Sequence, residues 1–209
     1  MIPDHHVPDD VLAEYVFGWT TENTALVTAT HLALCVRCRQ RVAQLETIGG
    51  ELLEATDNRQ VSPRALDVLL ESLDQAPPPL RAPPPEKVEA GSVTPRSMPE
   101  PLRSYAKAAR LEDIAWRETV AGKVWEHPIA LVDRRGTLIL TRFEPPWTAP
   151  QHGHQGLELV MPLCGGFRQG GQSFARGDVA VAHASDEHEA LIDPGSECIC
   201  LISKDEVCH

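Results

Sequence analysis

The stretch HLALCVRC, residues 31–38, places a histidine four positions before a cysteine and a second cysteine three positions later. On a helix, or on two helical turns joined by a tight corner, these spacings bring side chains to one face. His31, Cys35 and Cys38 are therefore expected to point at one spot. One imidazole and two thiolates are typical ligands of structural zinc, which takes four ligands in a tetrahedron. The stretch predicts three of the four ligands of a zinc site.

The fourth ligand is expected from the same half of the chain, where the only other histidines are His5 and His6. Both precede the first predicted helix, and either ring could swing toward the cysteines. Neighbouring carboxylates suit zinc less well beside two thiolates. The chemistry of the residues leaves His5 and His6 open as alternatives.

Two other interpretations of the cysteine pair carry less weight. Cysteine is often buried as a small apolar residue without any function, but the histidine in the same motif argues for a ligand role. A redox role for the CxxC pair normally comes with a βαβ pattern, and the sequence has none. Zinc binding is the favoured interpretation.

Residues 1–75 have the periodicity of helices. Apolar positions predict a helix from Asp9 or Asp10 to the stop at Gly18, and two more over residues 21–31 and 35–52. Ser62 and Pro63 predict the start of a fourth, whose stripe consists of Leu66, Leu69, Leu70 and Leu73. Four short helices would form a small all-α bundle with a modest core, which a zinc ion would staple.

Proline divides the chain, since nine of the eighteen prolines fall between residues 75 and 101. Repeated proline favours extended conformations, so residues 76–101 are expected to be a semi-stiff linker. Residues 102–209 then consist of short apolar runs between turn signals, such as TLILTRF and CICLIS. This pattern favours an all-β antiparallel sandwich or barrel over βαβ units.

The β half carries a second group of metal-ligand residues, in PQHGHQGLELVMPLCGG, residues 150–166. His152 and His154 share one face of an extended strand, and Glu158 follows a turn. Such a mixed nitrogen and oxygen site suits zinc, iron, manganese or nickel. A fourth donor is expected from a later strand, with His188 as the best candidate and His183 in reserve.

The segment from His6 through HLALCVRC resembles the zinc-binding domain of anti-sigma factors that inhibit extracytoplasmic-function (ECF) sigma factors. The resemblance implies zinc ligation by His6, His31, Cys35 and Cys38. The run ATHLALCVRCR, with a histidine pair near the start, is most similar to the cupin-bearing, ChrR-type branch of that family. In this family the zinc is structural, and the helices hide the surfaces that the sigma factor uses to bind core RNA polymerase.

Residues 102–203 resemble the cupin fold, a double-stranded β-helix barrel. The resemblance rests on His152, His154, Glu158 and Gly165, with a later Gly-Asp turn followed by histidine. The second cupin motif departs from the usual pattern, because His183 and Ser185 stand at its proline and glycine positions. The resemblance implies a second divalent metal, with zinc favoured. The sequence leaves open whether the cupin domains pair into a homodimer. The resemblance also implies release of the sigma factor on an oxidative signal such as singlet oxygen.

Composition excludes several other classes of protein. The net charge is −11, and residues 1–75 hold twelve acidic residues against five arginines and no lysine, so direct binding to nucleic acid is disfavoured. An acidic module can instead cover a basic protein surface. No apolar run is long enough for a membrane span, and the start lacks the pattern of a signal peptide, so a cytoplasmic location is expected.

The main alternative is a metal-dependent cupin enzyme, such as a dioxygenase or isomerase, with the helical half as a docking unit. Two features weigh against it and favour a protein that is not an enzyme. No basic residue that would orient a substrate stands out beside the cupin ligands, and the helical half has its own metal motif.

Overall fold

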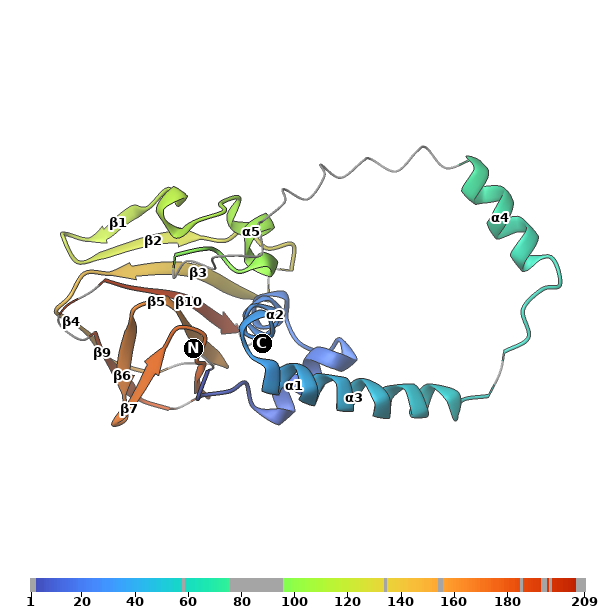
Figure 1. Cartoon of the computed structure of the whole chain (residues 1–209), viewed down its shortest axis with the longest axis horizontal. Helices are drawn as coiled ribbons and strands as arrows, with labels where there is room; N and C mark the ends of the chain where they lie inside the picture. The colour runs from blue at the N-terminus through green and yellow to red at the C-terminus, as the bar shows by residue number, and fades with distance from the viewer. Residues whose placement is uncertain are drawn as a thin grey trace.

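The computed structural model describes residues 3–57, 59–75, 96–133, 135–153, 156–184, 186–192, 195 and 197–205. The helices of these ranges are α1 (Asp9–Phe17), α2 (Glu22–Leu34), α3 (Val36–Glu54), α4 (Ala65–Gln75) and α5 (Glu100–Ala106), with a short 3₁₀ turn at Leu111–Asp113. Each of these helices is too short or too polar to cross a membrane. Figure 1 shows α1, α2 and the start of α3 beside a β region that follows them in the chain.

The strands form two antiparallel sheets, as expected for a cupin-like sandwich. The first has the order β1-β2-β3-β10-β5-β8, with bounds Arg117–Val120, Val124–Pro128, Gly136–Phe143, Cys198–Asp205, Glu158–Cys164 and Ala180–Ala182. The second has the order β4-β9-β6-β7, with bounds Trp147–His152, His188–Ile192, Gly166–Gln169 and Gln172–Ala175. The apolar runs TLILTRF and CICLIS form β3 and β10, which confirms the strand prediction there.

The strand β10 lies between two layers of the protein. On one face, toward the helices, lie Ile199, Leu201 and Ser203. On the other face, toward the second sheet, lie Cys200, Ile202 and Lys204. Because successive side chains of a strand point to opposite faces, a strand that is covered on both faces must be largely apolar throughout. The order of layers is therefore helices, six-stranded sheet and four-stranded sheet.

Helices and sheet share one apolar core. A single cluster of buried side chains includes Leu12 and Val27 from the helices together with Leu140, Leu159 and Leu201 from the sheet. The expectation of a helical bundle with its own core is wrong in this respect. The physical reason is size: α1 to α3 are too few and too short to bury their apolar faces alone, so the sheet covers them.

The fourth helix does not join that core. Every side chain described in α4 is exposed, including the predicted stripe, in which Leu69 is 57% and Leu73 is 62% exposed. Figure 1 shows α4 set apart from the sheets and from the other helices. The periodicity predicted the helix correctly, but the expectation that its stripe packs inside a bundle is wrong.

The predicted linker falls largely outside the described residues, which resume at residue 96. There, Met98 is buried at 1% exposure and α5 begins at Glu100. Arg103 Nε donates a hydrogen bond to the carbonyl of Met98 at 2.9 Å. Residues 96–101 therefore pack onto the β region.

The start of α2 is bound to the end of β10 through one carboxylate. Asp205 Oδ1 accepts hydrogen bonds from Thr21 Oγ1 at 2.8 Å, Asn23 Nδ2 at 2.8 Å and Thr24 Oγ1 at 3.2 Å. The residue opposite Asp205 in β3 is Gly136, where a Cβ would lie 2.5 Å from Asn23 Nδ2. A glycine at this position allows the helix to approach the sheet closely.

We expect Asp205→Ala to destabilise the protein by about 2 to 4 kcal/mol, because it leaves the buried donors of Asn23 and Thr24 without their charged acceptor. In a chain of this size the melting temperature should fall by about 4 to 16 °C. Thermal unfolding followed by circular dichroism measures the change. Asp113→Ala, at an exposed aspartate, is the control, and an equal effect of the two substitutions would contradict the assigned role of Asp205.

Candidate metal centre

Four side chains meet where α2, α3 and the N-terminal segment come together. Their ligand atoms all lie within 4.8 Å of one another, and the residues are His6, His31, Cys35 and Cys38. His31 Nε2 lies 3.2 Å from Cys38 Sγ, and His6 Nδ1 lies 3.4 Å from Cys35 Sγ. Zinc bonds of about 2.0–2.3 Å would place tetrahedral ligands about 3.3–3.8 Å apart. These four residues therefore can hold a metal, and their donor set suits zinc.

The corner between α2 and α3 positions the two cysteines. Cys35 has extended backbone angles, φ −112° and ψ 109°, and it ends α2 and begins α3 at once. Its amide still donates to the carbonyl of His31 at 2.8 Å, and its sulfur accepts the amide of Cys38 at 3.4 Å. Amide donors of this kind favour a thiolate. Of the two geometries that the spacing allowed, the structure has the corner between two helices, at Cys35.

The structure distinguishes His5 from His6, between which the sequence left the choice of the fourth ligand open. His6 points to Cys35, whereas the ring of His5 packs against Phe174 with 4.4 Å between the ring centroids. Only His6 therefore faces the thiols. Of the two histidines, His6 is the one that could serve as the fourth ligand of a metal.

Burial governs the protonation of the group when no metal is bound. His31, Cys35 and Cys38 are at most 3% exposed. Burial lowers the pKa of His31, and burial together with the neighbouring Cys35 raises the pKa of the Cys38 thiol to about 11. The metal-free group is therefore neutral at His31 and protonated at Cys38 at neutral pH. A bound zinc ion has to displace the thiol proton, and in return it holds two helices and the N-terminal segment together.

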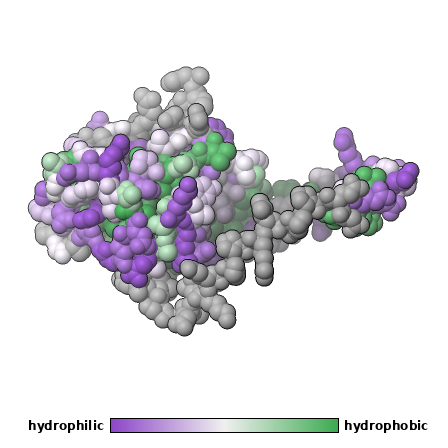
Figure 2. All heavy atoms as spheres, turned by 90° about the horizontal axis from the view of Figure 1, so that it is seen from above, coloured by the Kyte–Doolittle hydropathy of each residue, from purple (hydrophilic) through white to green (hydrophobic). Residues whose placement is uncertain are grey.

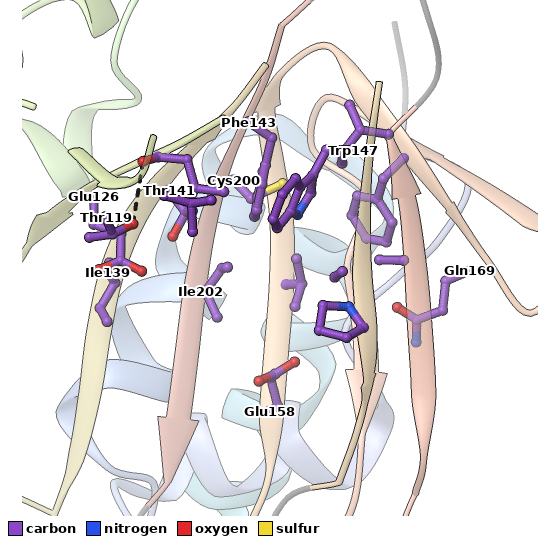
Figure 3. A pocket seen from close by; sticks show the side chains of 18 of the residues that line it. Thr119, Glu126, Ile139, Thr141, Phe143, Trp147, Glu158, Gln169, Cys200 and Ile202 are labelled. Atoms are coloured by element: carbon purple, nitrogen blue, oxygen red, sulfur yellow. Dashed lines mark hydrogen bonds between the residues drawn. The ribbon is translucent and has the colours of Figure 1, made fainter. Parts of the chain in front are cut away.

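A cavity of about 400 Å³ lies between the two sheets, on the far face of β10 from the helices. Its lining is mostly apolar, and Figure 3 shows Glu158 at one end with Phe143 and Trp147 toward the other. His188 Nε2 lies 3.5 Å from Glu158 Oε1. The structure thus brings together two of the residues predicted for the second metal site.

The structure gives less information on the other residues predicted for that site, His152, His154 and His183. The backbone of His152 is paired with His188 across β4 and β9, while its side chain and all of His154 lie outside the described residues. His183 is exposed just after β8, and of the two late candidates it is His188 that lines the cavity.

Sequence reasoning missed Lys204. Its Nζ lies 2.9 Å from Glu158 Oε2, so a basic residue does accompany the cupin ligands. The expectation that no such residue is present is wrong. The sequence pattern that could have predicted Lys204 is the alternation of side chains in CICLISKD. This alternation places Lys204 on the same face of β10 as Cys200 and Ile202.

A helical unit with a candidate metal centre, packed on an antiparallel β sandwich, is the architecture that the resemblance to cupin-bearing anti-sigma factors implied. The chain is 37% identical over 203 residues to the anti-sigma-E factor ChrR of Cereibacter sphaeroides, covering 96% of this chain and 89% of that protein. It therefore belongs to the ChrR-type family of anti-sigma factors.

One solved structure agrees with this assignment. The crystal structure of Rhodobacter sphaeroides SigE in complex with the anti-sigma ChrR matches with a TM-score of 0.77 and 33% identity, over 96% of this chain and 98% of that chain. An RmlC-like cupin protein from Ralstonia eutropha covers 46% of this chain at 20% identity and a TM-score of 0.40. No family model matches the sequence.

Proposed function

We propose that this chain binds an ECF sigma factor and keeps it from core RNA polymerase. The observation that carries the proposal is a surface with no partner in the described part of the chain. It consists of two separate sets of exposed apolar side chains, one on the second half of α3 and one on α4: Ile48, Leu52 and Leu53, and Leu66, Leu69, Leu70 and Leu73. Each is 49% exposed or more.

Large apolar side chains that are exposed together along one helix often mark a binding site for another protein. Figure 2 shows hydrophobic and hydrophilic atoms side by side on α4, as expected for an amphipathic helix. An amphipathic helix binds by laying its apolar face into a groove of the partner. The relative of known structure was crystallised in complex with the sigma factor SigE, and this supports a sigma factor as the occupant.

Charge supports the same kind of partner. The chain carries a net charge of −11, and Asp67 and Glu71 lie on α4 beside the leucines. An acidic rim around an apolar stripe complements a basic protein surface, such as one that would otherwise contact DNA.

The direct test is to purify the tagged full-length chain from its own cells and to identify stoichiometric partners by mass spectrometry. We expect an ECF sigma factor, and we expect the purified complex to be inactive with core RNA polymerase in a transcription assay. Recovery of the chain without any sigma factor, under conditions in which the chain is folded and loaded with zinc, would count against the proposal.

We further propose that the sandwich senses an oxidative signal, such as singlet oxygen, and that this signal releases the sigma factor. In this proposal His152, His154, Glu158 and His188 hold a second divalent metal, for which zinc is favoured. The cavity supports the proposal, because an open site next to Glu158 and His188 admits a small molecule. Histidine ligands that are accessible in this way can be oxidised.

Glu158→Gln is expected to leave sigma-factor binding unchanged and to slow oxidative release at least about tenfold, because an amide is a poorer metal ligand and loses the ion pair with Lys204. Dissociation of the purified complex under an illuminated photosensitiser measures the rate. Glu189→Gln is the matched control, since Glu189 lies in β9 next to His188 but is exposed. If the sigma factor were released at the normal rate from Glu158→Gln, Glu158 would have no role in sensing the signal.

One observation favours a second candidate function, a metal-dependent cupin enzyme. Lys204 lies in the cavity beside Glu158, where it can orient an anionic substrate. Consumption of oxygen together with an organic substrate by the iron-loaded chain would establish that function. Its absence, with sigma-factor binding present, would leave the sandwich as a sensor without catalysis.

A further inference from the structure

The turn between β7 and β8 contacts the metal centre of the helical region, although it belongs to the sandwich. We propose that Gly177 and Asp178 in this turn are the outer shell of the metal centre, so that the docked sandwich sets the metal affinity of the helices. The inference concerns metal binding alone, and it holds whether or not the partner of the chain is a sigma factor.

The first contact fixes the orientation of His31. Its Nδ1 lies 2.7 Å from the carbonyl oxygen of Gly177, while its Nε2 faces Cys38. A carbonyl oxygen can only accept, so Nδ1 carries the proton and Nε2 presents its lone pair to the metal. A hydrogen bond of this kind to a ligand histidine holds the ring in place and makes it a stronger ligand. The ring is completely buried, so water does not compete for the bond.

The second contact fixes the segment that leads to His6. Asp178 Oδ1 accepts the amides of Asp4 at 2.7 Å and of His5 at 3.0 Å. The carbonyl of His5 in turn accepts the amide of Val179 at 3.2 Å. Three hydrogen bonds to the turn therefore hold the backbone just before the ligand His6. Asp178 is only 4% exposed, and its Oδ2 accepts the amide of Ala175 at 2.7 Å, so the carboxylate itself is held by the turn.

The turn is also tightly packed. Gly177 has φ +91°, and a Cβ at this position would lie 3.0 Å from Pro3 Cγ and 3.3 Å from Leu34 Cδ1. A side chain here would push the turn away from the end of α2 and from the N-terminal segment. Both histidine ligands depend on this close approach, one through Gly177 and the other through Asp178.

Two consequences follow for the two parts of the protein. Metal binding and docking of the turn must favour each other equally, because a coupling between two binding events is reciprocal. The turn also continues into β8, where Ala182 pairs with Glu158 of the cavity. A rearrangement of the cavity therefore has a short path of backbone contacts to the metal centre.

The test is the affinity of the full-length chain for Co²⁺, followed by the absorption of cobalt–thiolate bonds, which reports on the centre that contains Cys35 and Cys38. We expect Asp178→Ala and Gly177→Ala to weaken binding about 10- to 100-fold and to alter the cobalt spectrum. Asp178→Asn should recover much of the loss, since it keeps an oxygen for the amides of Asp4 and His5. Asp186→Ala, at an exposed aspartate that accepts the amide of His183 at 2.8 Å, should bind as the unchanged chain does.

A second measurement covers the case in which a variant does not fold. Removal of the metal from the unchanged chain should speed hydrogen exchange at least about tenfold at the amides of Asp4, His5 and Val179, which join the turn to the ligand segment. Normal cobalt affinity in the folded Asp178→Ala and Gly177→Ala variants would overturn the inference. So would exchange at these three amides that does not change on metal removal.

Discussion

Cys35→Ser or Cys38→Ser is expected to abolish zinc binding at the helical centre and sigma-factor binding together. The structure gives the reason, because the four candidate ligands come from α2, the corner with α3, α3 itself and the segment before α1, so a bound metal would join these segments. Serine is a poor zinc ligand at neutral pH, so the centre would keep three ligands at most. The helices would then lose one of the contacts that set their relative positions.

The expected effect is large. A structural zinc site contributes about 10–16 kcal/mol of binding free energy that is also folding free energy. The whole stability of a typical domain is only about 5–15 kcal/mol. Loss of even about 3 kcal/mol of the metal contribution would lower sigma-factor affinity about 100-fold, because the helices must first be ordered before they bind.

Zinc content, circular dichroism and the dissociation constant of the sigma-factor complex check this prediction. Cys164→Ser is the matched control, because Cys164 is a free cysteine at the end of β5 and lies outside the metal group. Treatment of the unchanged chain with a chelator should reproduce the effect, and added zinc should reverse it. A zinc-free variant with normal sigma-factor affinity would show that the metal has no part in binding.

The local features of this protein follow from local sequence signals. The spacing in residues 31–38 predicted the convergence of His31, Cys35 and Cys38, because a helix and its corner are determined over a few residues. Gly18 at φ 72° ends α1, as expected from its position after an apolar helix. The strands β3 and β10 follow from runs of apolar residues between turns.

The features that sequence reasoning missed depend on contacts between distant residues. Asn23 and Thr24 have no sequence feature that distinguishes them from other helix positions. The residues around them do not predict that Asp205 is their hydrogen-bond partner. The same holds for Gly177, whose carbonyl contacts a histidine 146 positions earlier in the chain. Such hydrogen bonds depend on how the helices pack on the β sandwich. A local sequence pattern carries no information about that packing.

The central strand β10 links the two candidate sites of the protein. Lys204 lines the cavity and pairs with Glu158, and the next residue, Asp205, binds the start of α2 on the opposite face. Because neighbouring residues of a strand move together, a shift of Lys204 would also displace Asp205 and the helix that it holds. With the turn at Gly177, this makes two contacts that join the sandwich to the helices of the candidate metal centre, and the proposed release on a signal would require such contacts.

Leu69→Ser combined with Leu73→Ser is expected to weaken sigma-factor binding at least about 100-fold without changing the fold. These leucines lie one helical turn apart on α4 and are 57% and 62% exposed, so they support no core of their own. Buried in a groove of a partner, each would be an anchor worth about 2 kcal/mol or more. Two such losses correspond to a factor of about 100 to 1,000 in the dissociation constant.

The matched control is Val68→Ser on the same helix. Val68 is 59% exposed, close to the value for Leu69, but it points away from the leucine stripe, so its replacement should change the affinity less than about threefold. Zinc content and circular dichroism of all variants should equal those of the unchanged chain, which separates this result from loss of the metal centre. If Val68→Ser weakened binding as much as the double leucine variant, the effect would come from loss of helix and not from the stripe. Normal binding by the double variant would place the sigma factor elsewhere on the protein.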